Sequence, residues 1–207
     1  MSLHTIVHAH LLAAAEPDFP ALHAALVRLG PLELPRRSSL SFPVHLCRAI
    51  SGQQISVKAA QSIWGRVEAS AGEAPLLDHF HAGNAEVLRA CGLSGAKTRT
   101  IITIAQTHRE VGLDTELLKA LPIADRTARL TEIWGVGQWT ADMMNIFYFG
   151  EPDIWPHGDV AARKTLERLT SKRRKTVRTA SRFKPWRSWL AYYMWAHADA
   201  PPDGVPA

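Results

Sequence analysis

Apolar residues recur at three- and four-residue steps along most of the chain, which is the spacing of one face of an α-helix. The pattern is clearest in residues 55–69, 101–111, 126–134 and 189–198. Glycine and proline separate these segments, and continuous β-branched strands joined by two-residue turns are absent from the sequence. The pattern therefore predicts about ten helices of ordinary length and an all-α fold.

Length and composition restrict the class of protein. The 207 residues suffice for one compact unit or two small lobes, and 46% hydrophobic with 21% charged residues is ordinary for a globular protein. No apolar run approaches the roughly 18 residues of a membrane span, and the stretch from Leu11 to Ala15 is a poor signal-peptide core. Cys47 and Cys91 lack the spacing of a disulfide framework or a metal site, so we expect both in the core. We expect a cytoplasmic protein without a membrane partner.

The net charge of +5 conceals one strongly basic segment. Residues 163–187 contain eleven Lys or Arg and a single acid, Glu167, whereas acidic residues outnumber basic ones in the rest of the chain. Such concentrated positive charge is expected where a polyanion docks. A solvated helix face or a basic loop is the alternative interpretation.

Residues 130–141, LTEIWGVGQWTA, predict two helices joined by a turn. The first helix would end at Trp134, and Gly135 and Gly137 would let the backbone turn tightly while Val136 fills the space between the helices. The free N–H groups and the dipole at the start of the second helix suit a phosphate group. A plain helix–turn–helix with a glycine cap is the alternative.

A proline-containing loop, DIWPHGD over residues 153–159, follows the hairpin and precedes a helical run over residues 160–169. Asp159 therefore opens a helix, and aspartate is a common N-cap. The positive end of the helix dipole would also favour its ionised form. Capping and a catalytic use of this carboxylate are compatible.

Together, these features resemble the helix-hairpin-helix base-excision DNA glycosylases, whose signature is this hairpin, a Pro-rich loop and a catalytic aspartate. The chain looks most similar to the 3-methyladenine DNA glycosylase II family. The likeness spans roughly residues 43–197 and includes SGQQIS at 51–56, CGLSGAK at 91–97, and KPWRS at 184–188 leading to Trp195. The best-known bacterial member also has an N-terminal β-domain, which we expect to be absent here.

The resemblance implies that Asp159 is the catalytic residue. A base alkylated at a ring nitrogen is already cationic and leaves without a proton, so one anion beside the oxocarbenium-like sugar could suffice. Asp159 would stabilise that charge or activate the attacking water. Bifunctional relatives carry a Schiff-base lysine where this chain has Trp139, and residues 121–163 contain no lysine, so we expect no lyase activity. The absence of cysteine after Cys91 removes the iron–sulfur branch of the superfamily.

By the same resemblance, Trp139 and Trp195 line the pocket for the flipped base. An aromatic wall favours a cationic base through cation–π attraction, worth about 0.5–2 kcal/mol. Core packing is the alternative role for both tryptophans. Met143 stands where the nearest relative has a tyrosine, which leaves the substrate range open.

In this family the loop corresponding to residues 51–56 inserts a side chain into the gap left by the flipped base. Gln54, next to Gln53, falls on that position and could both fill the stack and hydrogen-bond the orphaned base. A polar turn between helices is the alternative. The expected DNA phosphate contacts are Gly135, Val136, Gly137, Thr140 and Arg187, with surface solvation as the alternative for the arginine. The main-chain carbonyls of Thr131, Ile133 and Val136 match places where relatives hold a monovalent cation, Na⁺ or K⁺.

We therefore expect a monomeric all-α enzyme of two helical lobes with a cleft between them. Residues 41–150 would carry the wedge loop and the hairpin. Residues 1–40 and 151–200 would form the lobe of Asp159, and residues 201–207 a disordered tail. The predicted reaction is hydrolysis of the N-glycosidic bond of alkylated bases in double-stranded DNA, with no required cofactor. The alternatives are a glycosylase for another lesion, a non-catalytic DNA-damage-binding module, and a protein-binding helical domain.

Overall fold

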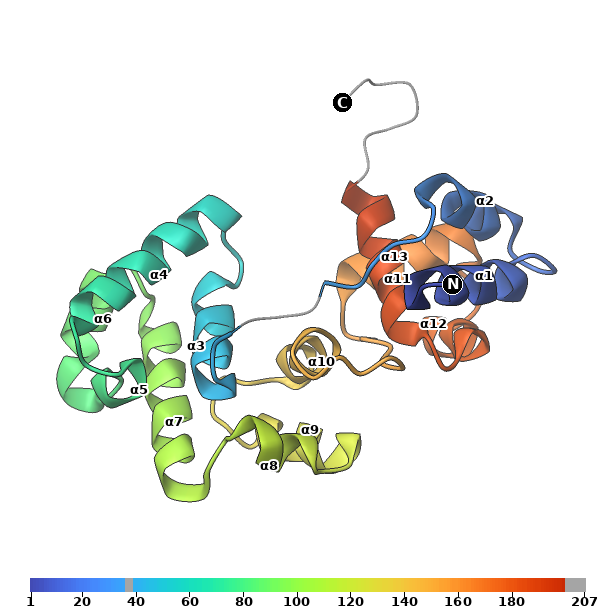
Figure 1. The fold of residues 1–207 in the computed structure, drawn as a ribbon. Coiled ribbons are helices and arrows are strands. Elements are labelled where there is room, and N and C mark those ends of the chain that lie inside the picture. The colour runs from blue at the N-terminus through green and yellow to red at the C-terminus, as the bar shows by residue number, and fades with distance from the viewer. Residues whose placement is uncertain (36–38, 200–207) are drawn as a thin grey trace. The chain divides into compact units, whose positions relative to one another are not determined.

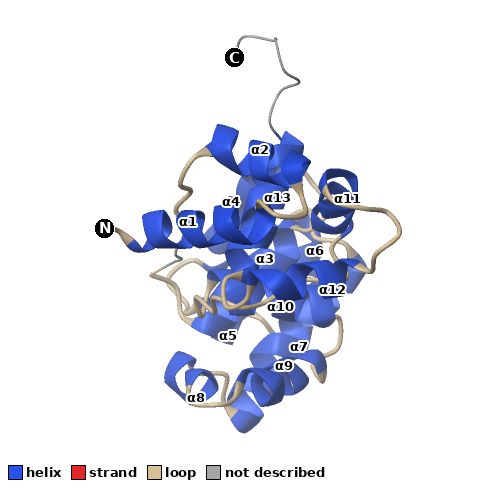
Figure 2. Ribbon diagram, turned by 90° about the vertical axis from the view of Figure 1, so that its right-hand side faces the viewer, coloured by secondary structure: helices blue, strands red, loops and turns tan. Residues whose placement is uncertain are grey.

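The computed structural model describes residues 1–35 and 39–199, and every regular element in these residues is a helix (Figure 2). This confirms the predicted all-α fold. The chain divides into two compact units, one of residues 37–141 and one that combines residues 1–36 with 142–207. The tail predicted to be disordered, residues 201–207, lies outside the described residues.

The unit of residues 37–141 is built around α3 (Phe42–Gly52), which packs against α4 (Val57–Ala71) and α7 (Gly95–Val111) (Figure 1). Its core consists of aliphatic and aromatic side chains from these helices, among them Leu46, Ile50, Trp64, Val67, Ile101 and Ile104. Shorter elements complete the unit: α5 (Leu76–His79), η1 (Ala82–Asn84), α6 (Ala85–Ala90), α8 (Thr115–Lys119) and α9 (Ile123–Thr131).

The other unit joins the two ends of the sequence. α13 (Arg187–Asp199) packs against α11 (Val160–Leu169) and α2 (Pro20–Leu29), and α2 in turn packs against α1 (Leu3–Ala15) (Figure 1). The elements α12 (Thr176–Ala180) and η2 (Ser181–Phe183) precede α13. The buried side chains that hold these helices together include Leu11, Leu26, Leu166, Leu190 and Tyr193.

The boundary between the units falls inside a helix. α10 (Gln138–Phe147) contains both Ala141, the last residue of one unit, and Asp142, where the other unit resumes. The sequence placed this boundary at Gly150, because glycine and proline interrupt the helical pattern there. A helix that runs through a boundary leaves no such interruption.

The helical segments agree with the apolar spacing except at their ends. α11 begins at Val160 as predicted, but the helix expected to end at Trp134 is α9, which ends at Thr131. The Thr131 hydroxyl donates to the carbonyls of Thr127 and Ala128, and the chain then turns before Gly135. The apolar spacing continues past the end of α9 because Ile133, which lies in the turn after the helix, is also buried.

Two further expectations can be compared with the structure. None of the described helices is long and apolar enough to cross a membrane. Cys47 and Cys91 are both buried and are not bonded to each other, as expected of core residues. Burial also raises the pKa of the Cys47 thiol, which makes it a poor nucleophile.

Candidate active site

Asp159 is positioned by a tight turn at the start of α11. Its backbone N–H donates to the carbonyl of Pro156 at 2.8 Å, and its carboxylate Oδ1 accepts from the N–H of Ala162 at 2.8 Å. The predicted N-cap is thereby confirmed. Asp159 is only 9% exposed. A carboxylate with so little access to water needs such donors, because a buried polar group without hydrogen-bond partners is costly.

A second donor reaches the same oxygen from α13. The indole Nε1–H of Trp195 donates to Asp159 Oδ1 at 2.9 Å, across 36 positions of the sequence. The Trp195 ring also lies 5.7 Å from the ring of Phe147, centroid to centroid. The sequence predicted Trp195 as a wall of the base pocket. The structure shows that its indole holds the carboxylate, and its role in the pocket stays a prediction.

The candidate pocket residues of α10 share one face of that helix. Trp139, Met143 and Phe147 are four positions apart, the spacing that places side chains on adjacent turns. Trp139 is 41% exposed, so core packing does not explain it, whereas Met143 is 9% exposed. Phe147 was not identified from the sequence, although its four-residue spacing from Met143 was a usable signal.

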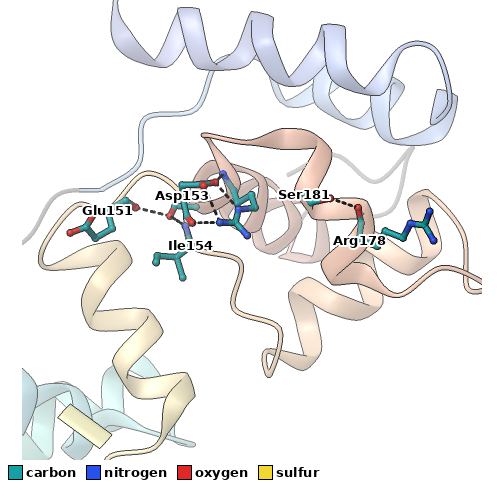
Figure 3. A network of polar contacts seen from close by, with 7 residues as sticks. Glu151, Asp153, Ile154, Arg178 and Ser181 are labelled. Atoms are coloured by element: carbon teal, nitrogen blue, oxygen red, sulfur yellow. Dashed lines mark hydrogen bonds and ion pairs between the residues drawn. The ribbon is translucent and has the colours of Figure 1, made fainter. Parts of the chain in front are cut away.

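A network of polar contacts fixes the loop that leads to Asp159 (Figure 3). Arg187 Nε donates to Asp153 Oδ1 at 2.6 Å and Arg187 Nη2 to Oδ2 at 2.9 Å, in a two-pronged ion pair. The Ser188 hydroxyl donates to the carbonyl of Glu151 at 2.6 Å and accepts from the N–H of Ile154 at 3.0 Å. The Arg187 guanidinium thus braces the protein itself, a role that sequence reasoning missed, and its expected contact with phosphate stays a prediction.

The hairpin lies in the other unit. Gly135 has a φ of +84°, and a Cβ at this position would collide with the side chain of Thr100, so only glycine fits. Gly137 does not have a positive φ, and a Cβ there would meet no atom within 4 Å. Val136 between them is 3% exposed, so its side chain is buried, as predicted. The fold therefore requires glycine at 135 and leaves position 137 open.

The hydroxyl of Thr140 does not face an open surface. Thr140 is 5% exposed, and its Oγ1 accepts from Gln53 Nε2 at 3.1 Å. This bond ties the predicted wedge loop to the second helix of the hairpin, both within residues 37–141. The side chain of Thr140 thus has an internal partner, and its expected contact with phosphate stays a prediction.

Gln54, predicted as the wedge, has the most unusual backbone of the described chain. Its φ is +57°, and it is the one non-glycine residue with a positive φ among the residues that the structure describes. The residue is also exposed. A polar side chain presented from a left-handed backbone is expected where surrounding contacts enforce the loop for a function.

In the basic segment of residues 163–187, some cations form ion pairs and others do not. Arg163 pairs with Glu167 at 3.3 Å, and Arg182 pairs with Asp18. The four consecutive basic residues at 172–175 are all exposed, and no ion pair joins their side chains to another described residue. This surface can therefore attract a polyanion.

The helical hairpin and the helix-capping aspartate that follows it carry the resemblance to base excision repair proteins that the sequence suggested. The chain belongs to this class: residues 47–188 match the HhH-GPD superfamily of base excision DNA repair proteins. The resemblance inferred from the sequence is confirmed.

One curated protein and two solved structures show which members of this superfamily the chain is similar to. The chain is 30% identical to DNA-3-methyladenine glycosylase 1 of Schizosaccharomyces pombe over 158 residues, which cover 72% of this chain and 69% of that protein. The structure of DNA-3-methyladenine glycosidase from Bacillus halodurans is similar with a TM-score of 0.77 and 26% identity, covering 93% and 89% of the two chains. The structure of Schizosaccharomyces pombe Mag1 in complex with abasic DNA is similar with a TM-score of 0.75 and 26% identity, and the match covers 92% of this chain and 95% of that one.

Proposed function

We propose that this protein is a monofunctional DNA glycosylase that releases alkylated bases of the 3-methyladenine type from duplex DNA and leaves an abasic site. One observation carries the proposal: Asp159 is a nearly buried carboxylate held by the Ala162 N–H and the Trp195 indole. The names of the relatives support the substrate class, and one relative is bound to abasic DNA.

The proposed reaction breaks the bond between C1′ of the sugar and the ring nitrogen of the base. A purine methylated at ring nitrogen N3 or N7 carries a positive charge, so it takes the electron pair of that bond and leaves as a neutral molecule. The sugar becomes oxocarbenium-like, and the anion of Asp159 stabilises it. Water then adds to C1′ and gives up one proton, to the Asp159 carboxylate or to the solvent. Because two N–H groups already fix Oδ1, the carboxylate needs no reorientation during the reaction.

The base must leave the DNA stack before this chemistry is possible. Trp139 offers an exposed indole on the same face of α10 as Met143 and Phe147. An electron-rich ring attracts a cationic base more than a neutral one. This face of α10 would therefore select alkylated bases.

The test measures base release from methylated duplex DNA by the wild type and by Asp159→Asn, with strand nicking scored separately. Asparagine keeps an oxygen that can accept from Ala162 and Trp195, so the cap survives while the charge is lost. We expect release to fall by about 100-fold or more, with DNA affinity and thermal stability retained. Asp125→Asn, the same change at an exposed aspartate of α9, is the matched control.

Each outcome has a definite meaning. Release of methylpurine by the wild type without nicking supports a monofunctional enzyme, as the lysine-free segment 121–163 predicts. Full activity of Asp159→Asn would contradict the role of the carboxylate. If wild type releases nothing from methylated DNA, alkylbase excision is wrong. Duplexes with uracil or 8-oxoguanine in the same assay then test the alternative of another lesion.

Three further expectations belong to the proposal. A Na⁺ or K⁺ ion would rest on the carbonyls of Thr131, Ile133 and Val136, since carbonyl oxygens at a helix end suit a monovalent cation. Replacing both ions with choline at constant ionic strength should then weaken DNA binding. The enzyme would act as a monomer, and in the cytoplasm. Sedimentation of the protein alone and with DNA tests the oligomeric state.

A further inference from the structure

The loop that carries Gln54 adopts a conformation that its own residues do not favour. A non-glycine residue with a φ of +57° is strained, and Gln54 is exposed, so packing of its side chain does not enforce this backbone. The restraint must come from contacts of the neighbouring backbone. Two such contacts converge on the loop.

The first contact comes from α7. Lys97 Nζ donates to the carbonyl of Ser51 at 3.0 Å and to the carbonyl of Gln53 at 2.8 Å. Ser51 is at the end of α3 and Gln53 is its C-cap, where carbonyls lack partners within the helix and the dipole is negative. One ammonium group therefore bonds a carbonyl in the last turn of α3 and a carbonyl at the start of the loop.

The side chain of Lys97 is held in this position by its two hydrogen bonds. Its side chain is partly buried, and desolvation lowers the pKa of its ammonium group. Hydrogen bonds from a charged donor are roughly twice as strong as neutral ones, so the two carbonyls hold the ammonium group firmly in this position. A cation that served only solubility would extend into water instead.

The second contact comes from the hairpin, where Gln53 Nε2 donates to Thr140 Oγ1. Gln53 is thus held through its backbone by α7 and through its side chain by α10. The next residue, Gln54, has little freedom left. A loop built in advance avoids the entropic cost of ordering when DNA binds.

We propose that Lys97 is a positioning residue that holds the wedge loop in the conformation that presents Gln54 to the duplex. It acts through the loop and does not touch the reacting atoms. The inference rests on the proposed function, because only a protein that extrudes bases needs a preformed wedge.

The test replaces Lys97 with methionine, which keeps the length of the side chain but removes its donors. Lys97→Arg restores donors for both carbonyls, and Lys119→Met, at an exposed lysine of α8, is the matched control. Single-turnover excision is measured on a lesion in a paired duplex and on the same lesion in a bulge, where unstacking costs less. We expect Lys97→Met to slow excision from the paired duplex about tenfold or more, with little effect on the bulge. Lys97→Arg should recover most of the rate.

A second readout does not depend on activity. Hydrogen exchange of the backbone amides of residues 52–56 in the DNA-free protein should become faster in Lys97→Met and stay unchanged in Lys119→Met. Equal loss of rate on both substrates, or unchanged exchange in the loop, would overturn the role of Lys97. A wild type that excises no base would contradict the proposed function, while the exchange measurement would still decide whether Lys97 holds the loop.

Discussion

Gly135 and Gly137 are two positions apart in the hairpin, yet the structural reasons for glycine differ between them. The left-handed backbone of Gly135 and the nearness of Thr100 make glycine a requirement of the fold. Gly137 has an ordinary backbone and open space beside it. The absence of a side chain there is therefore better explained by the close approach of a ligand.

Replacing each glycine with alanine should distinguish these reasons. Gly135→Ala should reduce stability by about 1–3 kcal/mol, because it combines a strained φ with a steric clash. Gly137→Ala should leave the melting temperature nearly unchanged and weaken DNA binding, since its methyl group would occupy the path of the phosphate. Thermal melts and fluorescence anisotropy with a labelled duplex measure both. A Gly137→Ala protein that binds DNA normally would refute the ligand explanation.

Trp195 offers a second prediction at this scale. Trp195→Phe keeps an aromatic ring but removes the N–H that donates to Asp159. Loss of one hydrogen bond to a charged group should reduce the single-turnover rate by about tenfold or more, at nearly constant DNA affinity. An unchanged rate would leave Trp195 with a packing role only. Trp186→Phe, a half-buried indole of the same unit, serves as the control.

The residues of the candidate site were predictable to different degrees. The helix cap at Asp159 followed from a local pattern, a proline-containing loop before a helix start, and its candidate catalytic role followed from the family resemblance. The bond from Trp195 and the bridge from Lys97 to the wedge loop join positions 36 and more than 40 residues apart. Such pairs depend on how helices pack, which the spacing along one chain segment does not contain.

At the scale of elements, the helices themselves were predictable because burial of one face imposes a period near 3.6 residues. Their ends were less so. Ile133 continues the apolar period beyond α9 because a turn residue can be buried as well as a helical one. The division within α10 was not predictable at all, since residues on both sides of Ala141 keep the same helical spacing.

One contact between elements yields a pH prediction. The Tyr193 hydroxyl of α13 donates to the carbonyl of Gly30 at 2.7 Å and accepts from the N–H of Leu32 at 2.9 Å, which fixes the chain that follows α2. Burial raises the pKa of Tyr193 above its ordinary value of 10.0. The unfolded phenol therefore ionises first as the pH increases.

Stability from Tyr193 should be complete below about pH 10 and should decline above it until the folded phenol also ionises. Tyr193→Phe should reduce stability by about 1–3 kcal/mol at neutral pH, because two backbone groups lose their partner. The variant should also show a shallower loss of stability under alkaline conditions. Urea denaturation of both proteins from about pH 8 to about pH 11 tests the difference. Parallel curves would show that Tyr193 does not titrate as described.

At the scale of the whole molecule, charge is concentrated although the net value is modest. The exposed residues at 172–175 follow the C-terminus of α11, whereas Asp159 caps its N-terminus. A ten-residue helix is about 15 Å long, so these cations would reach phosphates several nucleotides from the lesion. Their effect should appear in affinity rather than in chemistry.

Changing Lys172, Arg173, Arg174 and Lys175 together to serine should weaken binding to any duplex sequence. The slope of log affinity against log salt should become shallower by about 0.9 for each phosphate that the protein no longer neutralises. The excision rate at saturating protein should not change. Lys119→Ser supplies the control for removal of an exposed cation elsewhere. An unchanged salt slope would show that this segment does not bind DNA.

The cap that Asp159 forms, together with its proposed catalytic role, has a consequence for how such a protein evolves. To cap α11, residue 159 needs only an oxygen that accepts from the N–H of Ala162, and asparagine, serine or threonine supplies one. Selection for heat resistance or expression therefore does not preserve the carboxylate. We expect a single-residue change to asparagine at this position to give a folded protein that still binds lesions and shields them from active copies. Only selection under DNA damage would remove the variant that lacks the carboxylate.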